Sequence, residues 1–152
     1  MKDVTELPFN RFIGLELSPS QPDRLLTLPA APQYLNHVGT VHASALYSLA
    51  EASSGHFLAS HLMLPRDSIL PLLRKGEIKY RKPAIGEVFS RGIHDSATWT
   101  AFHSTYERKR RAIISFVIEL HTADEGLVAR ADFDWFVTEK AESATGTDSA
   151  RS

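Results

Sequence analysis

Hydrophobic and polar positions alternate along much of the second half of the chain. The clearest run is Ala112 to His121, in which Ile114, Phe116, Ile118 and Leu120 share one face. Apolar side chains at every second position predict a β-strand that buries one face. The same reasoning, with turn residues between the segments, predicts further strands over 74–82, 87–91, 99–106 and 127–137.

Shorter elements are predicted in the N-terminal third of the chain. Residues 8–14 suggest a short helical or irregular opening. Two short strands over 15–18 and 24–28 follow, joined by a proline-containing turn. Pro29 then ends this strand pairing.

One long helix is predicted between the N-terminal and C-terminal strands. Leu46, Leu49 and Phe57 recur at helical spacing, and the pattern stops before Pro65. Of the 19 residues from His42 to Ser60, 11 are Gly, Ala or Ser, so the helix needs close wrapping, which a curved sheet can provide. We therefore expect an α+β fold in which an antiparallel sheet of five to six strands surrounds one long central helix.

Composition sets the class of protein. The chain has 152 residues, 43% of them hydrophobic and 23% charged, which predicts a single domain over 1–139 followed by a disordered polar tail over 140–152. Its apolar runs are too short to span a membrane, and its N-terminus lacks the apolar core of a signal peptide. We expect a cytoplasmic protein with no membrane partner.

Charge and cysteine content exclude several functions. A net charge of −1 argues against a general nucleic-acid binder, which would carry a basic excess. The absence of cysteine excludes disulfides, thiolate metal sites and a cysteine nucleophile.

The predicted helix carries one isolated carboxylate. Glu51 is the only formally charged side chain between His42 and Ser60. A helical wheel places small or polar residues within about 60° of it, namely Ser44, Tyr47, Ser48, Ser54 and Gly55. One interpretation is a solvated helix face. The other is that a ligand or another protein surface lies against Glu51, because solvated faces usually carry several charges.

The loop before this helix offers a second candidate feature. Gly39 can adopt backbone angles closed to other residues, and the first helical turn leaves N–H groups unpaired. Such donors can stabilise a developing oxyanion. The alternative is that Asn36 and Gly39 are ordinary turn residues.

The remaining motifs give little support to a metal site, a serine hydrolase or a nucleotide hydrolase. The spacing of His37, His42, His56 and His61 fits no metal-binding pattern, so we expect no metal site. The sequence contains neither a Gly-x-Ser-x-Gly motif nor a phosphate-binding P-loop. The basic run Arg108–Arg111 suggests an exposed hairpin tip or a clamp for a phosphate-bearing substrate.

A family resemblance adds to these observations. The segment Asn36–His42, followed by a helix with Leu49-Ala50-Glu51, resembles the hotdog-fold acyl-CoA thioesterases, specifically the phenylacetate-pathway type and its uncharacterised relatives. Asn36 and Glu51 fit the family pattern at a separation of fifteen positions. Residues 80–87 and 125–129 are similar to two of the family's turns, so the resemblance covers about 8–138.

The resemblance implies a function. Glu51 would be the general base or nucleophile, and Asn36 would position the water or the thioester carbonyl. The backbone N–H of Ala43, with Gly39 and His42 beside it, would polarise the carbonyl oxygen. Substrate contacts would come from Ser44, Ser54 and Arg81. The ligand would be an acyl thioester, with coenzyme A as part of the substrate and no separate cofactor, and the site would lie between the subunits of a homodimer or a dimer of dimers.

The chain departs from the family pattern at three positions. Ala43 and Ser44 replace two glycines at the helix start, and Leu73 stands where the second strand often has Ser or Thr. These departures keep open an alternative from another class: a noncatalytic hotdog protein that binds an acyl or CoA ligand or serves as an assembly module.

Overall fold

The structure is a computed structural model and describes residues 3–141. In chain order its elements are η1 (Val4–Glu6), α1 (Pro8–Ile13), β1 (Glu16–Leu17), β2 (Leu26–Leu28), η2 (Pro32–Tyr34), α2 (Ala43–His61), η3 (Arg66–Ser68), β3 (Ile69–Tyr80), β4 (Val88–Ile93), α3 (Ser96–Lys109), β5 (Arg111–Thr122) and β6 (Leu127–Glu139).

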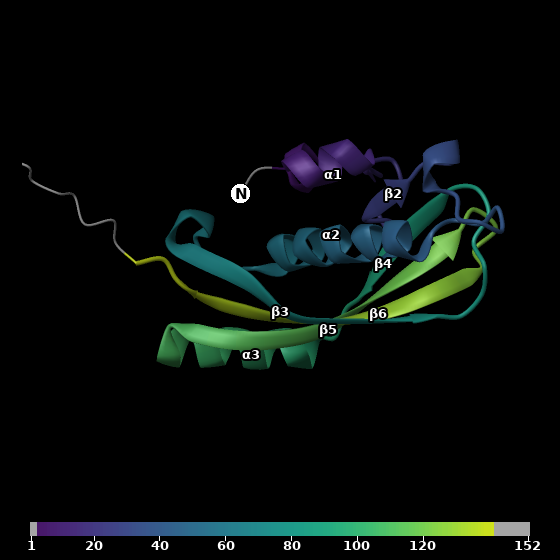
Figure 1. Ribbon diagram of the computed structural model, residues 1–152. Helices are drawn as coiled ribbons and strands as arrows, with labels where there is room; N and C mark the ends of the chain where they lie inside the picture. The colour runs from purple at the N-terminus through teal and green to yellow at the C-terminus, as the bar shows by residue number, and fades with distance from the viewer. Residues whose placement is uncertain (1–2, 142–152) are drawn as a thin grey trace, which may run out of the picture.

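The six strands form one antiparallel sheet in the order β1-β2-β4-β5-β6-β3. The α2 helix lies across one face of this sheet, and α1 lies on the side of α2 away from the sheet (Figure 1). The strands β3, β5 and β6 are the longest, at 12, 12 and 13 residues, and they are neighbours in the sheet. The predicted α+β architecture of a sheet around one long helix is confirmed.

Small residues let α2 approach the sheet closely. Leu49 and Ala50 are fully buried, and so is Ser53, whose hydroxyl lies 2.6 Å from the Leu49 carbonyl and 2.7 Å from Ser90 Oγ on β4. Ser90 in turn accepts the Leu26 N–H at 3.0 Å, so one buried hydroxyl pair joins the helix to two strands. The Gly, Ala and Ser content of the helix is therefore explained by packing.

The segment 99–106 is a helix, and the predicted strand there is wrong. Trp99, Phe102 and Tyr106 are buried at spacings of three and four residues, which is the helical period. Asp95 caps this helix by accepting the Thr98 N–H at 3.2 Å. Aromatic and threonine residues favour strands, so the composition of this segment does not reveal the helix.

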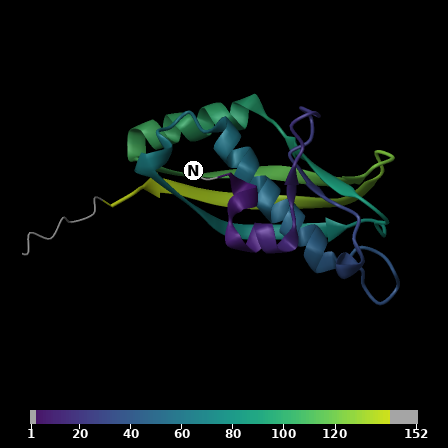
Figure 2. The same ribbon diagram turned by 90° about the horizontal axis from the view of Figure 1, so that it is seen from above.

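The helix α3 extends the core at one end of the molecule. It lies beside the C-terminal end of α2 (Figure 2). The Trp99 ring lies 6.0 Å from Phe57 of α2 and 5.8 Å from Phe116 of β5. The expected hairpin tip at Arg108–Arg111 is also wrong, because this basic run ends α3 and begins β5. Basic residues are favourable at a helix C-terminus, where the backbone dipole is negative.

The other predicted elements are confirmed with small shifts of their ends. They correspond to α1, β1, β2, α2, β3, β4, β5 and β6. The predicted disordered tail begins at Lys140, and its residues from 142 onward lie outside the described residues. Between residues 3 and 141, the structure contains no helix that is both long and apolar enough to cross a membrane.

Replacing Ser90 by alanine tests the buried hydroxyl pair. The Leu26 N–H would lose its acceptor inside the core, so we expect the free energy of unfolding to fall by about 1–3 kcal/mol in urea denaturation. The control is Ser115→Ala, since this exposed hydroxyl contacts only Asp134, and we expect a change within about 0.5 kcal/mol. Equal effects of both substitutions would contradict the assigned role of Ser90.

Candidate active site

Glu51 lies in the middle of α2 and is half-buried. Burial raises the pKa of its carboxyl group above the ordinary value, because desolvation penalises the charged form. Among residues 3–141, no side chain forms a hydrogen bond or an ion pair with this carboxylate. A partly desolvated carboxylate without a partner is a candidate for proton transfer.

The serines near Glu51 are engaged within the protomer. Ser54 is fully buried; its hydroxyl donates to the Glu51 carbonyl at 2.7 Å and accepts the Trp135 indole N–H at 3.0 Å. Ser48 donates to the Ser44 carbonyl at 2.9 Å. The substrate-binding role predicted for Ser54 stays a prediction, and its observed contacts fix the Trp135 ring against α2.

Asn36 organises the loop before α2. Its side-chain oxygen accepts the N–H groups of Val38 and Thr40 at 3.0 and 3.1 Å, and its amide nitrogen donates to Thr40 Oγ1 at 2.9 Å. Gly39 has a φ of 80° in this loop, which explains the glycine. The turn role of both residues is observed; a role in catalysis stays a prediction.

The first turn of α2 is capped by a histidine. His42 Nδ1 accepts the Ser44 N–H at 3.0 Å, which leaves the Ala43 N–H as the first unpaired donor of the helix among the described residues. The Ala43 carbonyl accepts the Tyr80 hydroxyl at 3.0 Å, so the end of β3 is attached to the helix start. One backbone donor is therefore available for an oxyanion.

Glu51 and this backbone donor are far apart along the helix. Eight residues separate Ala43 from Glu51, which corresponds to about 12 Å of axial rise. A glutamate side chain cannot cover that distance. The sequence places the predicted donors Gly39, His42 and Ala43 in one continuous segment, and the structure keeps Glu51 away from them within the same chain.

Ser44 and Arg81 are exposed. Arg81 follows β3, and its backbone N–H donates to the Val128 carbonyl at 2.8 Å. Leu73 packs on the core beside a register shift between Leu73 and Lys75. Leu73 itself therefore cannot supply the polar group that the family resemblance implies at this strand position.

Sequence reasoning assigned no role to Tyr80 or Trp135, and it placed Tyr47 on the Glu51 face without identifying its contacts. Tyr47 lies over Gly76, where an added Cβ would clash with its hydroxyl, and 6.2 Å from the Phe133 ring. Burial, and then proximity to Tyr47, raise the pKa of Tyr80. A glycine inside a strand indicates close approach of another group, so Gly76 was the available signal.

A histidine cluster lies at the far end of α2. The His61 ring stacks with His94 at 4.9 Å and with Trp99 at 5.0 Å, and His103 accepts the Met63 N–H at 3.1 Å. Across residues 3–141, no group of three or more His, Asp or Glu side chains has an arrangement that could hold a metal ion. The rings pack against one another and close this end of the core.

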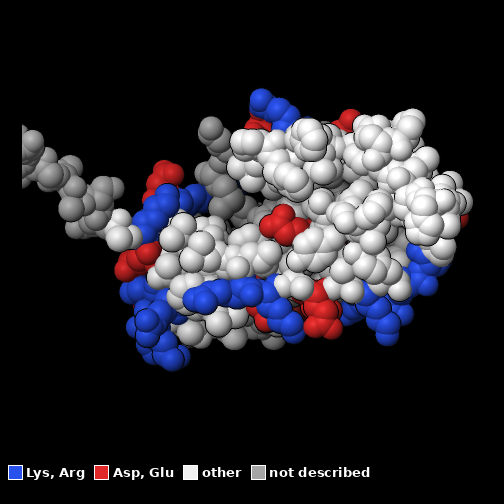
Figure 3. Space-filling model, viewed as in Figure 1, with Lys and Arg blue, Asp and Glu red and all other residues white. Residues whose placement is uncertain are grey.

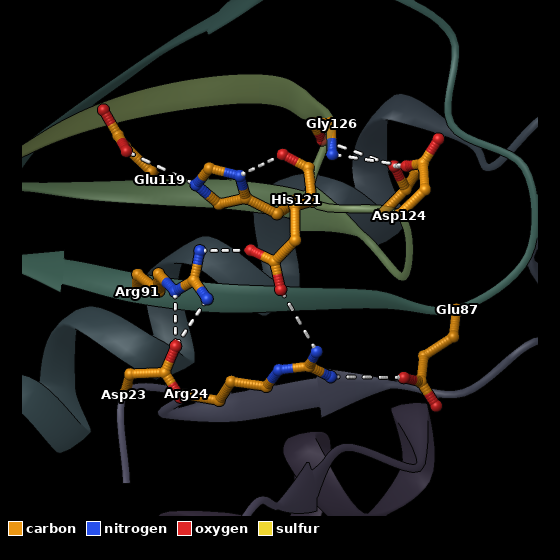
Figure 4. Close-up of polar contacts among 10 residues, drawn as sticks. Asp23, Arg24, Glu87, Arg91, Glu119, His121, Asp124 and Gly126 are labelled. Carbon is orange, nitrogen blue, oxygen red and sulfur yellow. Dashed lines mark hydrogen bonds and ion pairs between the residues drawn. The ribbon is translucent and has the colours of Figure 1, made fainter. Parts of the chain in front are cut away.

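A network of charged residues joins the turns at the other end of the sheet (Figure 4). Arg91 pairs with Asp23 and with Glu125, and Arg24 lies 3.5 Å from Glu125. The Arg24 guanidinium also covers the Phe89 ring at 3.6 Å. These acidic and basic groups are paired with one another. The network therefore stabilises the loops and is not a candidate active site.

Comparison with known proteins identifies the family. Residues 5–137 match the family model described as a domain of unknown function, DUF4442. The chain belongs to this family. No curated protein matches the sequence.

Solved structures share the fold of this DUF4442 chain. One is a Pseudomonas aeruginosa protein of unknown function described as a probable thioesterase, with a TM-score of 0.76 and 21% identity over 90% of this chain and 91% of that chain. Another is a Bacillus halodurans protein solved with CoA, with a TM-score of 0.62 and 19% identity over 85% and 74% of the two chains. A third is a Staphylococcus aureus thioesterase, with a TM-score of 0.61 and 12% identity over 87% of this chain and 99% of that chain. These likenesses confirm the hotdog fold.

Substitution of His42 tests the helix cap of the DUF4442 chain. His42→Ala removes the acceptor of the Ser44 N–H, and we expect the free energy of unfolding to fall by about 1 kcal/mol. His42→Asn keeps a capping acceptor and should remain close to the wild type. Urea denaturation measures both variants, with exposed His37→Ala as the control. If the Asn variant loses as much as the Ala variant, the cap is not what stabilises this turn.

The pH dependence of stability tests the environment of Glu51. A pKa raised in the folded state means that folding penalises the carboxylate, so the penalty is present above the folded pKa and absent below the unfolded value of about 4.3. We expect Glu51→Gln to raise the melting temperature at pH 7, and the gain to disappear near pH 4. The exposed residue Glu77 provides the control, since Glu77→Gln should give no such gain. A lower melting temperature for Glu51→Gln at pH 7 would refute the assignment.

Proposed function

We propose that this protein is a thioesterase that hydrolyses an acyl-CoA or acyl-carrier thioester, with Glu51 as the general base. The observation that carries the proposal is the half-buried, unpaired carboxylate at the centre of α2, with its raised pKa. A base whose pKa is shifted toward neutrality is suited to removing a proton from water. The reaction requires no cofactor beyond the CoA of the substrate.

The active site would be shared by two chains. Glu51 and the Ala43 N–H are about 12 Å apart along one helix, so a single protomer cannot present both to one carbonyl group. Two copies of α2 lying antiparallel would place Glu51 of one chain near the first helical turn of the other. The middle of the surface in this view is mostly uncharged, and most Lys and Arg lie along the lower edge and at the left end, which suits such an association (Figure 3).

The free edge of β3 supports this association. β3 is the last strand of the sheet and pairs only with β6 among the described strands. Leu70, Leu72 and Tyr80 on this strand are 41%, 42% and 45% exposed. An antiparallel pairing of two copies centred on Gly76 would set Lys75 opposite the partner's Glu77. Long edge strands are usually covered in native proteins, and a second copy would cover this one.

The proposed reaction proceeds through a tetrahedral intermediate. Glu51 takes a proton from a water molecule while the water oxygen bonds to the thioester carbonyl carbon. The oxyanion that forms accepts a hydrogen bond from the partner's Ala43 N–H. Collapse of the intermediate breaks the carbon–sulfur bond, and the leaving thiolate takes the proton from Glu51. The products are a carboxylic acid and the free thiol.

Asn36 would help to position the water or the carbonyl, and in each site it would come from the chain that supplies the Ala43 N–H, opposite Glu51 of the other chain. Its side-chain oxygen holds the loop, while only one amide hydrogen is needed for the bond to Thr40, so the second can contact substrate. Two relatives support the assignment. The Bacillus halodurans structure contains CoA. The Staphylococcus aureus thioesterase was solved with a glutamine and, separately, a glutamate replaced by alanine, and these two positions are fifteen residues apart, as Asn36 and Glu51 are.

One observation favours the second candidate, a noncatalytic hotdog protein that binds an acyl or CoA ligand. His42 occupies the Ser44 N–H, so the helix start offers one oxyanion donor. Removal of an oxyanion donor typically slows an enzyme by about 100- to 1000-fold. A protein of this kind would bind acyl-CoA without turnover.

Mixing two inactive variants tests both the base and the shared site. Glu51→Gln removes the base, and Asn36→Asp keeps the side-chain oxygen that closes the loop but loses the amide donor. We expect each variant alone to fall by about 100-fold or more in kcat/KM for acyl-CoA hydrolysis. A heterodimer would contain one site with both native residues, so mixed and refolded subunits should recover up to a quarter of the wild-type activity.

Thiol release with a chromogenic reagent gives the rates, and light scattering gives the oligomeric state. Ser104→Ala on α3 serves as the control and should match the wild type. If the wild type is no more active than Glu51→Gln on short, long and aromatic acyl chains, the proposed thioesterase activity is refuted. Activity without complementation, or from a monomer, would refute the shared site.

A further inference from the structure

A cavity of about 550 Å³ lies between the N-terminal segment, α2 and β3. Its walls are mainly apolar, and they include Val4, Leu7, Leu17, Leu58 and Trp135. This volume is typical of sites that bind small molecules. The cavity is formed by described residues of one chain, separately from the histidine cluster and from the charged network.

The cavity continues the Glu51 face of α2. Gly55, Leu58 and Ala59 line it, and a wheel at 100° per residue places all three within about 80° of Glu51. Gly55 lies about 6 Å and Ala59 about 12 Å further along the helix axis. A chain attached to a carbonyl group at Glu51 would therefore enter beside Gly55 and run toward the C-terminal end of α2.

Gly55 and Trp135 both line the part of the cavity that lies nearest to Glu51 along α2. A Cβ built at Gly55 would lie 3.7 Å from Trp135 Cζ2, which is ordinary van der Waals contact. The indole cannot easily move away, because its N–H is bonded to the buried Ser54 hydroxyl at 3.0 Å. The fold therefore has room for a methyl group at position 55, and a larger side chain there would occupy part of the cavity beside the indole.

Arg66 borders the far end of the cavity. It donates to the Ala59 carbonyl at 3.0 Å, and Ser60 and His56 lie on the same side. Burial lowers the pKa of His56, which favours the neutral imidazole beside an apolar ligand. The axial span from Glu51 to this end is that of a medium-length chain.

We infer that this cavity holds the acyl group of the substrate, that the substrate class is medium-chain, unbranched acyl thioesters, and that Gly55 and Trp135 determine the accepted chain. The inference rests on the proposed function and deepens it. It assigns the distal acyl carbons to the walls formed by the N-terminal segment. The thioester remains at Glu51.

Substitution at Gly55 tests the inference. Gly55→Ala should raise the melting temperature, because alanine favours the helix and its Cβ would meet Trp135 at an ordinary van der Waals distance. The same change should lower kcat/KM for octanoyl-CoA and decanoyl-CoA by about tenfold relative to butanoyl-CoA. Gly55→Leu should extend the loss to all but the shortest chains. Ser104→Ala, a helix-favouring change on α3, is the matched control and should leave the chain-length profile unchanged.

The outcomes separate this inference from the proposed function. If both Gly55 variants keep the wild-type chain-length profile while Glu51→Gln is inactive, the thioesterase stands and the assigned cavity is wrong. If the wild type hydrolyses no acyl-CoA, the thioesterase is wrong, and binding then tests the cavity. A decanoyl thioether of CoA should quench Trp135 fluorescence saturably in the wild type, weakly in Gly55→Leu and not in Trp135→Phe. No quenching in the wild type overturns the inference in either case.

Discussion

The close approach of α2 to the sheet is the constraint on which the rest of the structure depends. A helix can lie this near a curved sheet only if its inward face is small, and Ala50 and Ser53 meet that condition with no exposed surface. Polar groups on that face need internal partners, and the hydroxyl pair of Ser53 and Ser90 supplies them. Once the inward face is fixed, the rotation of the helix about its axis is fixed too. Glu51 then lies on a part of the helix surface that the sheet does not cover.

The position of Glu51 on the helix surface leaves its carboxylate partly desolvated, which lowers the stability of the fold. Glu51 is half-buried without a partner, so the fold carries an electrostatic penalty that a glutamine would avoid. Ser54 faces the same region, and its hydroxyl is committed to Trp135 and to the Glu51 carbonyl. The hydrogen bonds of Ser54 therefore position the helix and the indole, and they leave the Glu51 carboxylate without a partner. An unneutralised carboxylate retains its capacity to accept a proton.

Sequence reasoning succeeded where one period dominated a segment. The alternation in β5 and the helical spacing in α2 each predicted the correct element, and the motif from Asn36 to Glu51 predicted the hotdog fold. It failed for α3, where Trp99, Phe102 and Tyr106 have strand-favouring chemistry at helical spacing. At the site, the cap by His42 and the Ser54–Trp135 bond depend on backbone geometry and on residues 81 positions apart, which no local pattern contains.

The stiffness of α2 couples the proposed chemistry to association. A backbone N–H at Ala43 and the carboxylate at Glu51 belong to one continuous helix that is held by the sheet on one side and by α1 on the other (Figure 1). Their backbone positions lie about 12 Å apart along the helix axis, and rotation of the Glu51 side chain alone cannot cover that distance. Bringing the two groups together within one chain would require breaking the helix and its buried contacts. The free energy lost would exceed the free energy that a single new hydrogen bond contributes. In the proposed dimer, a second copy would supply the missing group without deformation. For this DUF4442 protein, the packing that makes the helix rigid is thus also the reason that a complete site would require two chains.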